Sequence, residues 1–132
     1  MDFARRSATH PHAETRRLLF GFEATEGVFA TTAARDYFLI QVVELPPGWM
    51  YMRMRVQGGG SRSQYENRDA LRGLRQVVES LVDNGWQVVL PQSGLCGWLM
   101  LGFGARTFGA GISLSMQRCE APGGGGGGGN PP

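Results

Sequence analysis

The sequence predicts a small α/β protein with a parallel β-α-β-α-β core, preceded by one extra strand or helix. Two observations lead to this fold class. A helical pattern lies between two strand patterns, and the alternation continues toward the C-terminus. Connections of this length join parallel strands through right-handed crossovers. The 132 residues, 42% of them hydrophobic, suffice for one hydrophobic core but not for two.

The central element of this core is a helix predicted over residues 64–83. Its apolar positions recur at helical spacing, at Leu71, Leu74, Val78 and Leu81. Ser63 and Glu66 form a capping box, in which each side chain bonds a free backbone N–H at the helix start. Asn84-Gly85 ends the helix, because glycine adopts the left-handed conformation there without steric cost.

Strand patterns flank this helix. Residues 49–57 alternate between an apolar and a polar face, which is the period of a strand with two different faces. Residues 86–90 form a second short strand before Pro91. A short helix over 95–103 and a Gly-rich strand over 106–113 complete the core.

The first half of the chain leaves alternatives open. Residues 33–45 are strongly apolar but fit neither period well, so they form either a buried strand or a buried helix. Residues 18–22 and 28–29 are either short strands or segments docked on the core. The single domain spans residues 18–120, between a polar mobile arm (1–17) and a disordered Gly/Pro tail (121–132).

Composition excludes several function classes. All 13 basic residues are arginine, so lysine chemistry, including Schiff bases and phosphate-loop nucleotide hydrolysis, is absent. The net charge of +2 is too small to indicate nucleic-acid binding. The N-terminus lacks the pattern of an export signal, and no membrane association is expected. We therefore expect a cytoplasmic protein in which Cys96 and Cys119 are free thiols.

Residues 86–113 resemble the closing strand-helix-strand of phosphate-binding (β/α)8 barrels. The similarity lies in residues 88–94, 101–105 and 108–111, where glycines follow the strands. In that family such glycines let backbone N–H groups approach a phosphate. Since the chain has about half the length of that barrel, the resemblance implies a half-barrel completed by another copy.

This resemblance implies an anion site built from backbone groups, with charge supplied by neighbouring arginines. The candidate ligand-binding residues are Ser93, Gly94, Gly109, Gly111, Arg53, Arg55 and Arg106. The alternative is that the glycines serve tight turns and close packing, and that Arg53 and Arg55 lie on a solvated sheet face.

The sequence leads to two hypotheses of function. The first is a small domain that binds a phosphate-bearing or other anionic small molecule. The second is an interaction or assembly module that binds a protein partner or forms a homo-oligomer, because the apolar content is high for a short chain. No catalytic residue is identified, and no cofactor or metal is expected, since His10 and His12 alone do not form a metal site.

Overall fold

The computed structural model of the chain describes residues 19–55 and 67–109. The predicted arm (1–17), the tail (121–132) and residues 110–113 of the last predicted strand lie outside this part. The elements, in chain order, are β1 (Leu19–Thr25), α2 (Glu26–Ala30), α3 (Thr32–Val43), β2 (Trp49–Arg55), α4 (Arg68–Asp83), β3 (Gln87–Leu90), α5 (Gly94–Leu101) and β4 (Thr107–Phe108).

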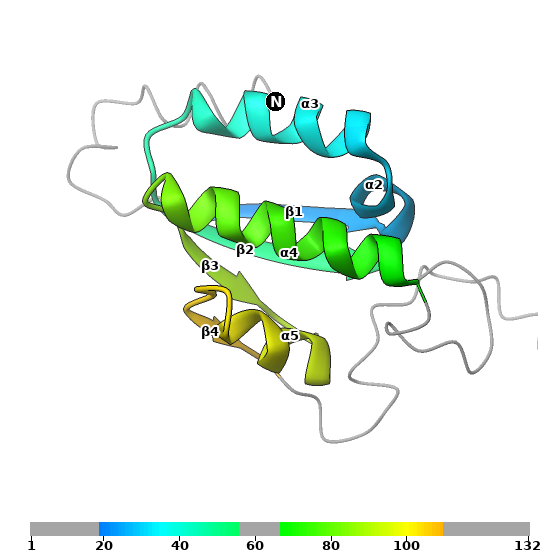
Figure 1. The fold of residues 1–132 in the computed structure, drawn as a ribbon. Coiled ribbons are helices and arrows are strands. Elements are labelled where there is room, and N and C mark those ends of the chain that lie inside the picture. The colour runs from blue at the N-terminus through cyan, green and yellow to red at the C-terminus, as the bar shows by residue number, and fades with distance from the viewer. Residues whose placement is uncertain (1–18, 56–66, 110–132) are drawn as a thin grey trace, which may run out of the picture.

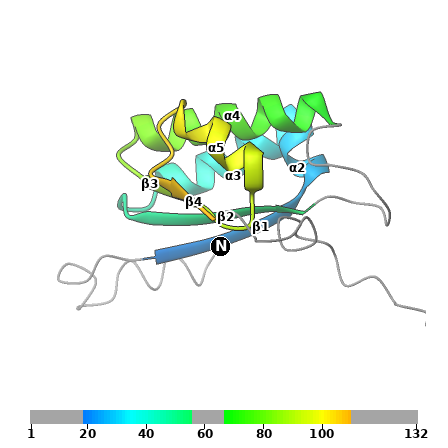
Figure 2. The ribbon, with the colours of Figure 1, turned by 90° about the horizontal axis from the view of Figure 1, so that it is seen from below.

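The strands form one parallel sheet in the order β1-β2-β3-β4, which confirms the predicted α/β fold class and its parallel core. Each strand lies beside the preceding one, on the same side, and helices form each connection. Right-handed crossovers that always step in one direction bring every helix to the same face of the sheet. Figures 1 and 2 show α3, α4 and α5 side by side over that face, and no described helix over the other.

The hydrophobic core lies between the sheet and this helix layer. From β2, Met50, Met52 and Met54 point into it, as the alternation predicts. The apolar stripe of α4 packs against them, with Leu74, Val77, Val78 and Leu81 all buried. Over β1, the rings of Phe22 and Phe38 stack with centroids 4.0 Å apart and attach α3 to the sheet.

The start of α4 differs from the prediction. The helix begins at Arg68 and Asn67 is its N-cap, whereas the predicted capping box at Ser63 and Glu66 lies outside the described residues. The Asn67 side chain accepts a hydrogen bond from the backbone N–H of Ala70 at 3.0 Å. Asp69 in the first turn adds a favourable interaction with the helix dipole. A helix that begins at Arg68 is therefore capped by Asn67 and stabilised by Asp69.

Residues 32–43 form a helix, which decides between the two alternatives left open for this segment. Phe38 and Val42, four residues apart, face the core. Tyr37 and Ile40 lie on the outside and remain exposed. Because apolar residues occupy both sides, the helical period was hidden. The strand alternative for residues 28–29 is wrong, since both belong to α2, where Phe29 is buried.

Gly73 lets α4 pack directly against the end of α2. A Cβ atom at this position would lie 1.8 Å from the carbonyl oxygen of Phe29, which is backbone and cannot rotate away. Gly97 has a similar role in α5, because a Cβ there would lie 2.0 Å from the Ser93 hydroxyl and 2.6 Å from Phe108. These two glycines set how closely the helices approach their neighbours.

We therefore expect Gly73→Ala to destabilise the fold. Overpacking of this kind costs about 1–3 kcal/mol, which outweighs the roughly 1 kcal/mol that alanine gains in a helix. Urea denaturation monitored by circular dichroism measures the change. Gly27→Ala in α2 is the matched control: its nearest neighbour would be Thr25 Oγ1 at 3.8 Å, so its free energy of unfolding should stay equal or rise. Equal effects of the two substitutions would contradict the packing described.

Candidate functional site

The face of the sheet opposite the helices is the main functional candidate, and we call it the open face. Its residues follow from the pairing register, in which Leu19, Gly21 and Glu23 of β1 lie opposite Trp49, Tyr51 and Arg53 of β2. Arg55, Gln87, Val89 and Thr107 continue this face across the sheet. Leu19 is 64% exposed and Tyr51 38%, so the open face presents apolar surface to solvent.

A charged cluster occupies the end of the open face where β1 and β2 finish. Glu23 Oε2 lies 3.4 Å from a terminal guanidinium nitrogen (NH1) of Arg53, and Glu23 Oε1 lies 3.0 Å from Arg55 Nε. Arg53 also donates a hydrogen bond to the Gln92 side chain, which links β2 to the turn after β3. Glu23, Arg53, Arg55 and Gln92 form what we call the arginine cluster.

This cluster combines two positive charges with one negative charge. The Nε atoms of Arg53 and Arg55 are shielded from solvent and lack a hydrogen-bond partner within the described residues. Arg55 Nε is close to Glu23, but this approach is an ion pair without hydrogen-bond geometry. Buried polar groups normally have partners. The described residues therefore leave both the charge and the donors of this cluster partly unsatisfied.

The turn after β3 is held by hydrogen bonds within the chain. The Ser93 N–H donates to Gly109 O at 3.0 Å, and the Gly109 N–H donates to Leu90 O at 2.9 Å. The Ser93 hydroxyl also donates to Leu90 O, at 2.6 Å. Two of the backbone N–H groups expected to cradle an anion, those of Ser93 and Gly109, are thus already engaged. At Ser93 and Gly109 the alternative of close packing in a turn describes the structure better.

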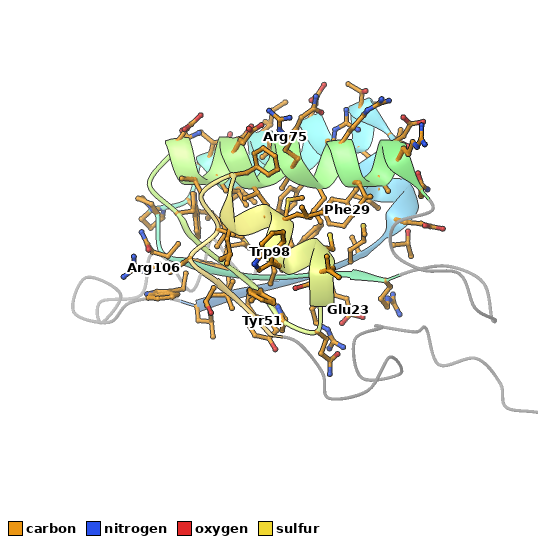
Figure 3. All side chains as sticks on the ribbon, turned by 60° about the horizontal axis from the view of Figure 1, so that its bottom comes forward. Glu23, Phe29, Tyr51, Arg75, Trp98 and Arg106 are labelled. Carbon is orange, nitrogen blue, oxygen red and sulfur yellow. The ribbon has the colours of Figure 1, made fainter. Side chains whose placement is uncertain are left out.

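The remaining candidate residues do not form one group. Gly94 opens α5 with a φ of +49°, and Gln92, two residues earlier, has the same left-handed φ, which is unusual for a residue other than glycine. Arg106 precedes β4, and its N–H donates to Val88 O. Figure 3 shows Arg106 and Glu23 at opposite ends of the sheet, so Arg106 lies apart from the arginine cluster. Gly111 lies outside the described residues.

The structure offers little support for other chemistry. Cys96 is buried, and this burial raises the pKa of its thiol to about 12, as expected for a structural cysteine. Within residues 19–55 and 67–109, no group of three or more His, Cys, Asp or Glu side chains could hold a metal ion. No helix in the same ranges is long and apolar enough to cross a membrane.

Sequence analysis missed the exposed apolar residues on the outer helices. Tyr37, Ile40 and Val43 are exposed on α3, and Leu95, Trp98 and Leu99 are exposed on α5. The surplus of apolar residues in the sequence was linked to a partner surface, but residues 33–45 were predicted to be buried and the surplus was not located on these helices. Glu23 was not among the predicted site residues, and it reaches the cluster as part of β1.

Neither family models nor curated proteins nor solved structures match the chain.

Proposed function

We propose that this protein is a non-catalytic assembly module that binds a protein partner through the open face of its sheet. The observation that carries the proposal is one face of an all-parallel sheet that no helix of residues 19–55 and 67–109 covers. Sheets of this kind occur almost only with both faces covered. Here the face without helices carries Leu19 and Tyr51 exposed beside Trp49, together with a charged cluster. A partner that covers this face would remove apolar surface from water.

The composition of the face supports binding to a protein. Aromatic side chains and arginine are the residue types enriched at protein interfaces, and the open face offers two aromatic residues and two arginines. The apolar residues lie toward the start of the strands and the charged residues toward their end. In such an arrangement the apolar residues supply the buried area that gives affinity, and the charged residues fix the orientation of the partner. The cytoplasmic location inferred from the sequence stays a prediction.

We predict that a cysteine placed on the open face is protected from maleimide reagents when the partner is present. Gly21→Cys suits this test because a Cβ there meets nothing within 4 Å. In a Cys119→Ser background, the remaining Cys96 is buried and protonated, hence unreactive. The thiol of Gly21→Cys should react about tenfold more slowly in extract of cells that naturally make the protein than in dilute purified form.

Gln76→Cys is the matched control, since Gln76 is exposed on α4, far from the open face. Its thiol should react at the same rate in both samples. Equal rates for both cysteines in both samples would overturn the assembly proposal, because the open face would then be free of any partner.

Binding of an anionic small molecule is a second candidate, and one observation favours it. The arginine cluster carries two guanidinium groups against one carboxylate, with guanidinium donors that lack partners in the described residues. Phosphate or a carboxylate could complete such a cluster with charge-assisted hydrogen bonds. Because the donors of Ser93 and Gly109 already have partners within the chain, we assign this candidate site to the arginines instead of the Gly-rich turn.

Thermal melts with and without millimolar phosphate test this second candidate. We expect phosphate to raise the melting temperature of the wild type, and to raise it more for Glu23→Gln, where the competing carboxylate is gone. Arg53→Gln should abolish the increase. Arg106→Gln is the control and should keep it, because that arginine lies apart from the cluster. A phosphate effect that ignores the Arg53 substitution would exclude the site.

A further inference from the structure

The charges of the open face are unbalanced within the described residues. Its charged members there are Glu23, Arg53 and Arg55, and the other positions that the register assigns to this face carry no charge. The Glu23 carboxylate approaches both guanidinium groups, Arg53 NH1 at 3.4 Å and Arg55 Nε at 3.0 Å. One negative charge is thus shared between two positive charges, and the face keeps an excess of one positive charge.

This excess is tolerated only while water reaches the arginine cluster. The side chains of Arg53 and Arg55 are 29% and 31% exposed, and that of Glu23 is 40% exposed. Solvent therefore screens the unbalanced charge in the isolated chain. A partner that covers the open face removes this solvent. Because burying a charge without a counter-charge is strongly unfavourable, the partner has to bring a negative group to this end of the face.

A second copy of this chain does not supply that group through its own open face. If the strands of two stacked copies run in the same direction, the two arginine clusters face each other and the positive excess doubles. If the strands run in opposite directions, each cluster faces the apolar start of the other sheet, with Leu19 and Tyr51. Facing like charges and unpaired buried charges both oppose binding. The charge of the face therefore favours a different protein.

We propose that the partner is a different protein that presents an aspartate or glutamate side chain to Arg53 and Arg55, and an apolar side chain to Tyr51. This inference rests on the assembly function proposed above and gives the chemistry of the partner. Arg53 and Arg55 lie two and four residues beyond Tyr51 in β2. At about 3.3 Å per residue, the partner carboxylate lies about 7–13 Å from its apolar contact along the strand direction.

The two arginines are suited to hold a protein carboxylate. A guanidinium group binds a carboxylate through parallel N–H bonds and gives up water more readily than an ammonium group. Both side chains leave β2 on the same face, two residues apart, so a carboxylate between them can accept from both. The Gln92 side chain accepts a hydrogen bond from Arg53 and holds it in place before the partner binds. Such preorganisation lowers the entropy lost on binding.

Protection of the Gly21→Cys thiol tests whether the partner recognises the arginines. Protection is the ratio of the maleimide rates in dilute purified protein and in cell extract, taken for the same variant. Arg53→Gln with Arg55→Gln should reduce it from about tenfold to about twofold or less, because the partner carboxylate is then buried without a counter-charge. The matched control, Arg68→Gln with Arg72→Gln on α4, removes the same charge away from the open face and should keep full protection. Circular dichroism melts confirm that each variant folds.

A zero-length cross-linker identifies the group that faces the cluster. The sequence contains no lysine, so Arg53→Lys introduces the only side-chain amine of the chain. The carbodiimide EDC joins an amine to a carboxylate in direct contact with it, and Glu23→Gln removes the acceptor within the cluster. In cell extract we expect a cross-link from position 53 to an aspartate or glutamate of another protein, located by mass spectrometry. Arg68→Lys on α4 is the control and should give none.

Three outcomes would overturn this inference and leave the assembly function standing. The first is full protection without Arg53 and Arg55, and the second is a protected face whose introduced lysine stays uncoupled. Either would show a partner without an acidic group at the cluster. The third is an equal loss of protection in the control pair, which would show an effect of overall charge.

Other outcomes would identify a different occupant of the open face. Protection in purified protein that rises with concentration would show a second copy, and protection that does not would show another part of the chain. Protection lost after nuclease treatment of the extract would show a nucleic acid. Each of these results overturns the inference. A Gly21→Cys thiol that is unprotected in every sample would remove the assembly function itself.

Discussion

The handedness of the strand connections determines most of this structure. Because each strand is added beside the last one, and each crossover is right-handed, every described helix lies on one face of the sheet. Burial follows from this arrangement: Met50, Met52 and Met54 are covered, while their neighbours in β2 are not. The same constraint leaves two sheet edges, two helix flanks and one sheet face without a partner among the described residues. The core and the proposed interface are therefore consequences of one topological rule.

The strands and helices of the second half could be predicted because their periods are clear. The alternation in β2 and the apolar stripe of α4 each reflect one buried and one solvated side. The predicted start of α4 was too early because Ser63 and Asn67 both precede plausible first turns, and the hydrogen bond from Ala70 identifies Asn67 as the N-cap of the helix. The helix α3 was ambiguous because its outer side carries Tyr37 and Ile40. Periodicity fails where both sides of an element are apolar.

The candidate site was predicted in part. Arg53 and Arg55 were identified from the polar face of their strand, and they do meet in one cluster. Their partner Glu23 comes from β1, about 30 positions earlier in the chain, and sequence alone cannot show which strands are neighbours. The glycines near Ser93 were interpreted through a resemblance, whereas the hydrogen bonds assign Ser93 and Gly109 to the turn itself. Ion pairs this exposed contribute only about 0–1 kcal/mol, so the cluster adds little to the stability of the fold.

The account depends on the difference between the two faces of the sheet, and neighbouring residues of β2 test it most directly. Tyr51 lies on the open face and Met52 under the helices. Free energies of unfolding should be measured for Tyr51→Asp and Met52→Asp at submicromolar concentration, where any assembly is dissociated. We predict a loss of about 3 kcal/mol or more, or no cooperative transition, for Met52→Asp, because it buries an unpaired charge. For Tyr51→Asp we predict a change within about 1 kcal/mol. Comparable losses at both positions would contradict the account, since they would mean that both faces are covered in the isolated chain.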